Sequence, residues 1–447
     1  MRQRDLSFGY RLFKGYVRKL VHGLYYKDVY YLNRENIPPA GTPMLMVSNH
    51  QNSLNDALGL IMCTDDRKTY AITRADIFNV SPLLSKFLYW LGLLPSFRAS
   101  KDGLDSLNQN DKTFRIAEDI VLEGKPVVIY PEAGHQNRRW LGKFSYGYTR
   151  LAFEAAERGN FEKEIFILPT CNHYSNYFGL RGSMLVKIGT PVSLAPYYEL
   201  YKTKPRTAQR KVNEEVRSQV DSMMLNIEDT EHYEAIDFLR EGSFGKEWAA
   251  RLGKNPAYLP DKLDADKKLV ASLKERGESV HGLLGEVDAF ARKLLSEHVS
   301  EADLDRNPSV FGTVLSVVAL VLLLPLALFC LWPSLISWCV PAYFTKKVGD
   351  NMLEGSFIIG LNAVVILPLC GLVTILVEGL TIGFAWGVAH SLILPLLCVF
   401  EWYYCSFAKR VVQRMFFARA CANGTMEALK AKRDSLYGNL RSELNIN

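Results

Sequence analysis

Met44-Leu-Met-Val-Ser-Asn-His50-Gln-Asn-Ser-Leu-Asn-Asp56 is the stretch of this sequence that indicates both a fold and a chemistry. Its apolar run is typical of a buried strand and ends at Ser48-Asn49, and His50 follows at once. Asp56 comes about two helical turns later. A histidine oriented by a nearby acid can take a proton from an alcohol, because the carboxylate stabilises the imidazolium. We therefore expect His50 to act as a general base, the alternative being an ordinary histidine near a helix start.

Three further stretches follow in a fixed order along the chain. They are Gly92-Leu-Leu-Pro-Ser-Phe-Arg98, Val127-Val-Ile-Tyr-Pro-Glu132-Ala-Gly134 and Ile165-Phe-Ile-Leu-Pro169. Together with Asn49-His50-(x)5-Asp56 they resemble the four blocks of the PlsC-like glycerolipid acyltransferase superfamily. That family carries Asn-His-x4-Asp, Gly-x5-Arg, Phe-Pro-Glu-Gly-Thr-Arg-Ser and Val-Pro blocks. The resemblance extends over residues 30–195, and four blocks in sequence order are far more specific than one.

The first and third blocks depart from the family pattern. The family spacing would place the acid at position 55, which here is Asn55, and the carboxylate is one residue later. Either the extra residue lies in the loop and Asp56 still meets His50, or Asn55 orients the imidazole. We favour Asp56, because a neutral amide can hold the tautomer but cannot stabilise the imidazolium. The third block lacks Thr-Arg-Ser, so Arg138 or Arg139 is expected to replace the missing arginine, unless both belong to a solvated basic loop.

The resemblance implies that the second and third blocks bind the acceptor, usually through its phosphate. Arg98 suits this role because a planar guanidinium can hold two phosphate oxygens, and Lys101 would assist as a point charge. Glu132 follows a strand-like run, at the edge where open α/β sheets gather ligands. It is expected to bond the glycerol hydroxyl of the acceptor or to anchor a basic residue. Gly134 would let the backbone approach the ligand closely.

Composition limits the other classes of function. The 447 residues carry a net charge of +6, and no nucleic-acid motif accompanies it, so the excess is expected to face anionic lipid or phosphate. The eight cysteines include no C-x-x-C pair, which favours packing in a reducing compartment over a disulfide framework. No pair of cysteines or histidines has metal-ligand spacing, so neither a bound metal nor a cofactor is indicated.

Hydropathy divides the chain, although its mean of -0.02 conceals this. An α/β fold is expected first, with a mixed, largely parallel sheet flanked by helices, followed by a helical region and C-terminal transmembrane helices. Residues 1–27 mix basic and aromatic side chains, as in an interfacial amphipathic helix, the alternative being a helix packed on the catalytic domain. The expected segments are 1–27, an acyltransferase domain at 28–200, a helical accessory region at 201–305, a transmembrane region at 306–408 and a basic helical cytoplasmic tail at 409–447.

The apolar blocks at 310–344, 357–377 and 381–399 predict membrane helices, because one span needs about 20 apolar residues. Basic residues follow the blocks at Lys346-Lys347 and Lys409-Arg410. If these residues stay on the cytoplasmic side with the catalytic domain, each block must enter the membrane and return. Two helical hairpins satisfy that requirement.

The function implied by the resemblance is that of a membrane-bound O-acyltransferase of phospholipid biosynthesis. Its donor would be acyl-CoA or acyl carrier protein, and its acceptor 1-acylglycerol 3-phosphate or glycerol 3-phosphate. Another lyso-lipid is an alternative acceptor, given the altered third block. From a different class of protein, a non-catalytic membrane lipid-binding scaffold is the alternative, and the apolar blocks alone also allow a transporter.

Overall fold

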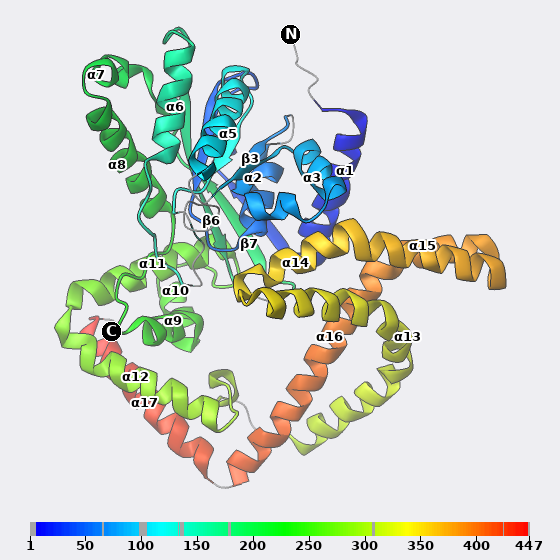
Figure 1. Cartoon of the computed structure of the whole chain (residues 1–447). Coiled ribbons are helices and arrows are strands. Elements are labelled where there is room, and N and C mark those ends of the chain that lie inside the picture. Colours follow the sequence, from blue (N-terminus) through cyan, green and yellow to red (C-terminus); the bar gives the residue numbers. More distant parts are fainter. Residues whose placement is uncertain are drawn as a thin grey trace. The chain divides into compact units, whose positions relative to one another are not determined.

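The computed structural model describes residues 6–64, 67–97, 105–132, 134, 138–177, 180–305, 309–422 and 424–445 (Figure 1). Two compact units are present, and they interleave along the chain. Residues 1–224 and 349–359 make up the first unit, and residues 225–348 and 360–447 make up the second. The first unit therefore includes a short segment that directly follows the first long apolar stretch.

A mixed sheet with mostly parallel strands organises the first unit, as the sequence predicts. Its strand order is β1-β7-β6-β2-β5-β3-β4, with β8 paired to β6. The β6–β7 and β6–β8 pairs are antiparallel, and the other pairs are parallel. The strands are β1 (Asp28–Leu32), β2 (Met44–Ser48), β3 (Tyr70–Arg74), β4 (Leu93–Ser96), β5 (Val127–Ile129), β6 (Phe166–Tyr174), β7 (Ser183–Ile188) and β8 (Val192–Ser193).

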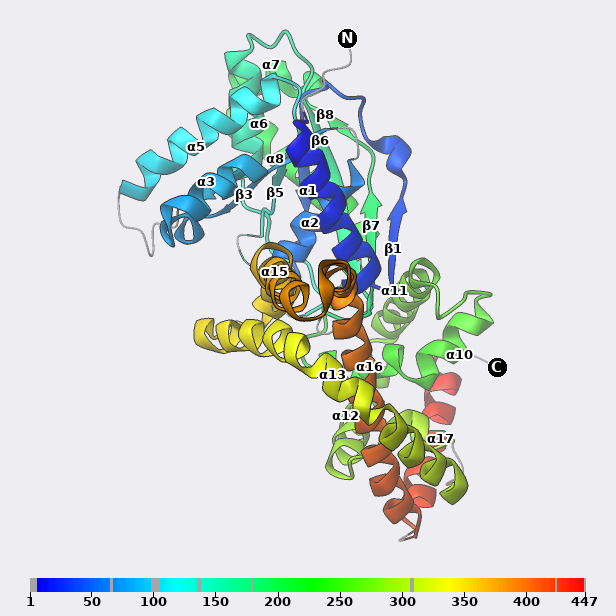
Figure 2. The same ribbon diagram turned by 90° about the vertical axis from the view of Figure 1, so that its right-hand side faces the viewer.

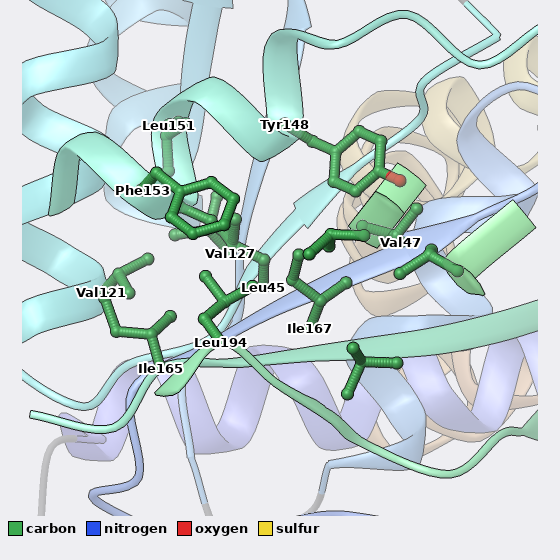
Figure 3. Close-up of a cluster of buried hydrophobic side chains, with 14 of the residues drawn as sticks. Leu45, Val47, Val121, Val127, Tyr148, Leu151, Phe153, Ile165, Ile167 and Leu194 are labelled. Carbon is green, nitrogen blue, oxygen red and sulfur yellow. The ribbon is translucent and has the colours of Figure 1, made fainter. Parts of the chain in front are cut away.

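The core of the first unit lies against the centre of this sheet (Figure 3). Leu45 and Val47 of β2 pack with Ile167 of β6 and with Phe153 from a covering helix. Every residue of β2 is buried, as expected for a central strand covered on both faces. The helices of this unit are α1 (Phe8–Lys19), α2 (Leu54–Cys63), α3 (Pro82–Leu91), α5 (Asp105–Leu122), α6 (Gly147–Arg158), α7 (Tyr198–Thr203) and α8 (Pro205–Met223).

Helix α1 packs on the first unit, one of the two alternatives considered for the N-terminal segment, and leaves apolar side chains exposed. One face packs on the catalytic unit beside α2 (Figure 2): Lys14 Nζ donates to the carbonyl of Thr64, and Arg18 Nη2 donates to that of Met62 at 2.6 Å. On the other face, Phe8 and Leu12 are 76% and 67% exposed. The helix is therefore fixed to the domain and still presents apolar side chains to its surroundings.

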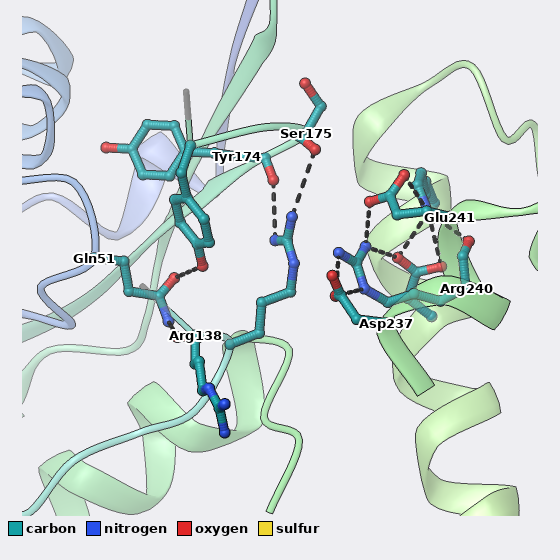
Figure 4. Close-up of polar contacts among 11 residues, drawn as sticks. Gln51, Arg138, Tyr174, Ser175, Asp237, Arg240 and Glu241 are labelled. Carbon is teal, nitrogen blue, oxygen red and sulfur yellow. Dashed lines mark hydrogen bonds and ion pairs between the residues drawn. The ribbon is translucent and has the colours of Figure 1, made fainter. Parts of the chain in front are cut away.

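The second unit is helical in the part of the chain described. Its first helices are joined by a buried ion-pair cluster in which Arg240 contacts Asp237, Glu241 and Asp266 (Figure 4). These contacts link α9 to α11. The helices are α9 (Tyr233–Glu241), α10 (Ser243–Arg251), α11 (Leu259–Arg276), α12 (Glu278–Ser296), α13 (Val310–Val348), α15 (Leu367–Glu378), α16 (Phe384–Ala422) and α17 (Thr425–Glu443); α14 (Glu354–Leu361) begins in the first unit and ends in the second.

The first apolar block differs from the hairpin expected from the sequence. It forms one helix, α13, which passes through three prolines and bends along its length (Figure 1). Pro341 cannot donate to the carbonyl of Ser337, and Asn362 Nδ2 donates to that carbonyl instead, at 3.0 Å. Proline thus bends this helix without reversing it. At Pro341, a side chain satisfies the carbonyl that the proline leaves unpaired.

The second apolar block does contain a reversal. A short π-helical segment, Gly379–Gly383, joins α15 to α16, and His390 Nδ1 lies 2.5 Å from Glu378 Oε1 across the turn. In the part of the chain described, Val310–Val348 and Glu354–Arg414 are each long and apolar enough to cross a membrane, and an 18-residue window in each has a mean hydropathy of 3.0 and 2.4, respectively. Their length and apolar composition are compatible with membrane association.

Candidate active site

The site forms where three neighbouring strands end. β2 pairs in parallel with β5 on one side and with β6 on the other. His50 follows β2, Glu132 follows β5, and Tyr174 is the last residue of β6. Because the carboxyl ends of parallel strands meet at one edge of a sheet, these three residues converge there although they are far apart in the sequence.

His50 and Asp56 form a hydrogen-bonded pair. The Nδ1 atom of His50 lies 2.9 Å from Oδ2 of Asp56, and the His50 side chain keeps 19% of its surface exposed. Asn55 instead donates to Oδ1 of Asn52 at 3.2 Å. Of the two alternatives left by the sequence, the geometry favours Asp56 as the partner of the imidazole. With Nδ1 facing the carboxylate, Nε2 is the nitrogen left for chemistry.

Asp56 is fully buried and is held by four donors. Its Oδ2 accepts from His50 and from the backbone amides of Gln51 (2.9 Å) and Asn52 (2.7 Å). Its Oδ1 accepts from the hydroxyl of Tyr174 at 2.6 Å. The pKa of Tyr174 is raised well above its ordinary value, first by burial and second by the charge of Asp56, so this phenol remains a donor. The carboxylate is therefore fixed before any substrate arrives.

The loop between His50 and α2 contains a residue in an unusual backbone conformation. Ser53 has φ 46° and ψ −119°, a conformation that side-chain-bearing residues rarely adopt. The strained residue lets three residues turn tightly enough for Asp56, in the first turn of α2, to reach back to His50. Sequence alone showed the longer spacing but not the backbone conformation that brings Asp56 to His50.

Glu132 has contacts different from those expected. Its Oε1 accepts from the backbone amide of His50 at 2.8 Å, and its Oε2 accepts from that of Gly142 at 2.7 Å. Among the described residues, neither of these contacts involves a basic side chain, and Glu132 is half-buried. Burial raises the pKa of Glu132, opposed by those two amide bonds. Glu132 thus ties the loop after β5 to the backbone of the histidine.

Glu132→Gln is expected to lower the free energy of unfolding by about 1–3 kcal/mol at pH 7, because its NH₂ would face a backbone donor. In the wild type the pKa of Glu132 is higher in the folded state, so between its ordinary and its raised pKa the folded state binds more protons than the unfolded state. The free energy of unfolding therefore falls as the pH rises through that range. The variant should lose that pH dependence. Thermal unfolding across pH, with the exposed Glu123→Gln as control, checks both effects; equal stability of the two variants would contradict them.

Tyr130 was missed by the sequence analysis. Its ring stacks on His50, with centroids 4.2 Å apart and an interplanar angle of 18°. Its hydroxyl is buried with no hydrogen-bond partner among the described residues, and burial raises its pKa well above the ordinary value. The ring limits the rotation of the imidazole. The only sequence feature that could have indicated a role for Tyr130 in the site is its position directly before Pro131-Glu132.

The side chain of Asn49, the residue before the histidine, fastens β2 to β6. Its Oδ1 accepts from the backbone amide of Asn172 at 2.8 Å, and its Nδ2 donates to the carbonyl of the same residue at 2.9 Å. This paired contact mimics one step of a strand ladder just beyond β2. It accounts physically for an amide side chain immediately before His50.

The two arginines of the third block differ in environment. Arg139 is buried; its Nη1 donates to the carbonyl of Tyr174 at 3.0 Å and its Nη2 to that of Ser175 at 3.5 Å (Figure 4). It therefore braces the end of β6 and is not part of a solvated loop. Arg138 is half-buried, and its guanidinium lies 5.8 Å from the ring centre of Trp140. Of the two, Arg138 has the environment that better suits contact with a substrate.

The remaining predicted residues are located only in part. Arg98 and Lys101 lie outside the described residues. Gly134 is described, and a Cβ added to it would meet no atom within 4 Å. Among the described residues, nothing in the fold therefore requires glycine at this position.

Comparison with known proteins agrees with this geometry. A family model described as Acyltransferase matches residues 28–172, which contain His50, Asp56 and Glu132. These residues form an acyltransferase domain. This domain marks the chain as an acyltransferase and supports the resemblance to PlsC-like enzymes drawn from the four blocks.

Among solved structures, one match is PlsC, the 1-acyl-sn-glycerophosphate (LPA) acyltransferase of Thermotoga maritima. It is 14% identical, covers 46% of this chain and 78% of that chain, and has a TM-score of 0.34. At that score the likeness carries no weight for the function of this chain. No significant match was found among curated proteins.

Proposed function

We propose that this chain is a membrane-bound O-acyltransferase that esterifies a hydroxyl of a glycerol-phosphate acceptor in phospholipid biosynthesis. The carrying observation is the His50–Asp56 pair, with Nδ1 held by a buried carboxylate and the imidazole edge still accessible. No Ser or Cys nucleophile is needed in this scheme, because the acceptor hydroxyl attacks directly. The donor is acyl-CoA or acyl carrier protein.

The proposed reaction uses His50 twice. Its Nε2 takes the proton of the acceptor hydroxyl as that oxygen attacks the thioester carbonyl. Asp56 stabilises the imidazolium that forms, and the stacked Tyr130 ring keeps the imidazole plane fixed. When the tetrahedral intermediate collapses, the C–S bond breaks and the imidazolium returns the proton to the leaving thiolate. The products are an ester and a free thiol, and His50 is neutral again.

Acceptor binding is proposed for the basic residues of the second and third blocks. Arg98 and Lys101 would pair with the acceptor phosphate, with Arg138 at the edge of the site and Gly134 giving the ligand room. Glu132 supports this pocket through the backbone of His50 and Gly142. The acceptor is 1-acylglycerol 3-phosphate or glycerol 3-phosphate, with another lyso-lipid as the second candidate.

A membrane location is supported by a surface of the catalytic unit as well as by the apolar helices. Helices α1 and α3 pack through Phe13 and Phe87, whose ring centroids are 5.6 Å apart. Their outer sides expose Phe8, Leu12 and Leu83. Apolar side chains flanked by the exposed bases Arg11, Lys19 and Lys86 suit a bilayer interface. We place the catalytic domain on the cytoplasmic side, where basic flanks favour it.

The segment that follows the first long apolar stretch also reaches the catalytic helix. Ser356 Oγ accepts from the backbone amide of Leu54, the first residue of α2, at 3.0 Å. The side chain of Ser53, which precedes the helix, makes no capping bond. A Cβ on Gly355 would come 2.7 Å from both Asn55 Nδ2 and Tyr25 Oη, so glycine is required for this close approach. Ser356 therefore caps the helix that carries Asp56.

Ser356→Ala is expected to lower kcat by about 3- to 10-fold with little change in KM, because losing a cap costs about 1 kcal/mol and loosens α2. Ser356→Thr retains a hydroxyl and should restore activity. Steady-state kinetics on both variants in nanodiscs checks this. A loss of activity in the threonine variant equal to that in the alanine variant would show that the hydroxyl is not the group that matters.

The proposed function is tested with purified protein in nanodiscs and labelled acyl-CoA or acyl carrier protein. Glycerol 3-phosphate, 1-acylglycerol 3-phosphate and a lyso-phospholipid are offered side by side, with His50→Ala as the blank. His50-dependent ester formation on one glycerol-phosphate acceptor supports the proposal and identifies the acceptor. Product only with the lyso-phospholipid favours the second candidate. No product from any acceptor with either donor would favour a non-catalytic lipid-binding scaffold.

A further inference from the structure

We propose that Asp229, His232 and His281 of the helical unit form a site for a divalent transition-metal ion. Their carboxylate and imidazole ligand atoms all lie within 4.8 Å of one another. His232 Nδ1 is 2.9 Å from Asp229 Oδ2, and the rings of His232 and His281 stack with centroids 4.5 Å apart. This cluster, called the Asp-His-His cluster below, is separate from the acyltransferase domain in sequence.

The chemistry of the donors selects the class of ion. Two imidazoles and one carboxylate suit zinc and similar borderline metals, and magnesium and calcium prefer oxygen ligands. Ligand atoms on a tetrahedral zinc are about 3.3 Å apart, so small side-chain rotations would bring this cluster to that geometry. His281 is exposed and can supply that rotation. Three protein ligands leave one position for water.

The local fold holds two of the ligands in advance. Asp229 Oδ1 accepts from the backbone amides of Glu231 (3.1 Å) and His232 (2.9 Å), which fixes the turn before α9. The hydrogen bonds that fix this turn use Oδ1 of Asp229 and involve neither its Oδ2 nor His281. A role limited to the turn therefore leaves the second histidine unexplained.

The site would join two helices that already pack together. His232 immediately precedes α9, and His281 lies in the first turn of α12. Further along the same pair, Phe238 and Phe290 meet edge to face with ring centroids 6.1 Å apart. A metal ion at the Asp-His-His cluster would clamp the other end of this helix pair. Its expected effect is on the stability of the helical unit, with no step of acyl transfer routed through it.

The test uses untagged full-length protein in detergent, stripped with a chelator and titrated with Zn²⁺ by calorimetry and equilibrium dialysis. The wild type is expected to bind one equivalent and to gain thermal stability on binding. His281→Ala should weaken the affinity by about 100-fold, since three ligands become two. That residue is exposed, so the variant is expected to fold. His298→Ala, in the same unit, is the matched control and should bind as the wild type does.

Two results would overturn the site. One is a wild-type protein that takes up no stoichiometric Zn²⁺. The other is a His281→Ala variant that binds and gains stability as the His298→Ala control does. To distinguish a folding defect from ligand loss, His281→Cys supplies a different zinc ligand at the same place. Recovery of binding in that variant supports coordination at residue 281, and loss of binding in a folded Cys variant counts against it.

Discussion

Replacing His50 by Gln is expected to lower kcat by about 10²- to 10⁴-fold, the range that a positioned general base contributes. Gln can preserve a hydrogen bond to Asp56 but cannot take a proton from the acceptor hydroxyl. KM for the acceptor should change little, because no phosphate contact is assigned to this side chain. Initial rates at saturating donor, over a range of acceptor concentrations, measure both parameters.

The control for this variant is its fold. His50 is partly exposed, and the bonds of Glu132 and Asp56 to its loop use backbone amides that the glutamine variant retains. Thermal unfolding should therefore differ from the wild type by far less than in Glu132→Gln. A folded His50→Gln protein that keeps most of its activity would refute the general-base role and leave the scaffold alternative standing.

Asp56→Asn is expected to give the second large loss, also about 10²- to 10⁴-fold in kcat. The amide oxygen can keep the three donors of Oδ2 if its NH₂ takes the place of Oδ1 toward Tyr174. The Tyr174 hydroxyl can turn to accept, so the fold should survive. The variant then removes chiefly the charge that stabilises the imidazolium. Kinetics on a preparation shown to be folded measure this contribution.

Two companion variants make the result specific to the charge. Tyr174→Phe removes the donor to Oδ1 but keeps the carboxylate and its contact with His50, so kcat should fall only a few-fold, about the effect of one hydrogen bond. Asn55→Ala tests the alternative partner of the imidazole and should have a similarly small effect. Comparable losses in Asn55→Ala and Asp56→Asn would show that the pairing of His50 with Asp56 is not what drives the reaction.

Much of the catalytic domain could be predicted from local patterns. The apolar run before His50 predicts a buried β-strand, because a short continuous apolar run is typical of one. The acid at position 56 could be favoured over Asn55 on chemical grounds alone. The hairpin expected in the first apolar block is not found, because that expectation rested on the basic flanks and the structure keeps a single helix through three prolines. The side chain that donates to the carbonyl of Ser337, Asn362, is contributed by a later helix.

The sequence by itself determined the acyltransferase domain, the identity of the histidine and the two apolar stretches, because each depends on residues close together in the chain. Only the tertiary structure shows the contacts of Glu132 and Ser356 and the grouping of the Asp-His-His cluster. The residue type of Glu132 does not reveal whether it binds a substrate or backbone amides. Its contacts with the amides of His50 and Gly142 depend on β5 lying beside β2. Ser356 meets Leu54 only through the folding of a distant segment. Contacts between remote residues are set by strand order and helix packing, which local periodicity does not encode.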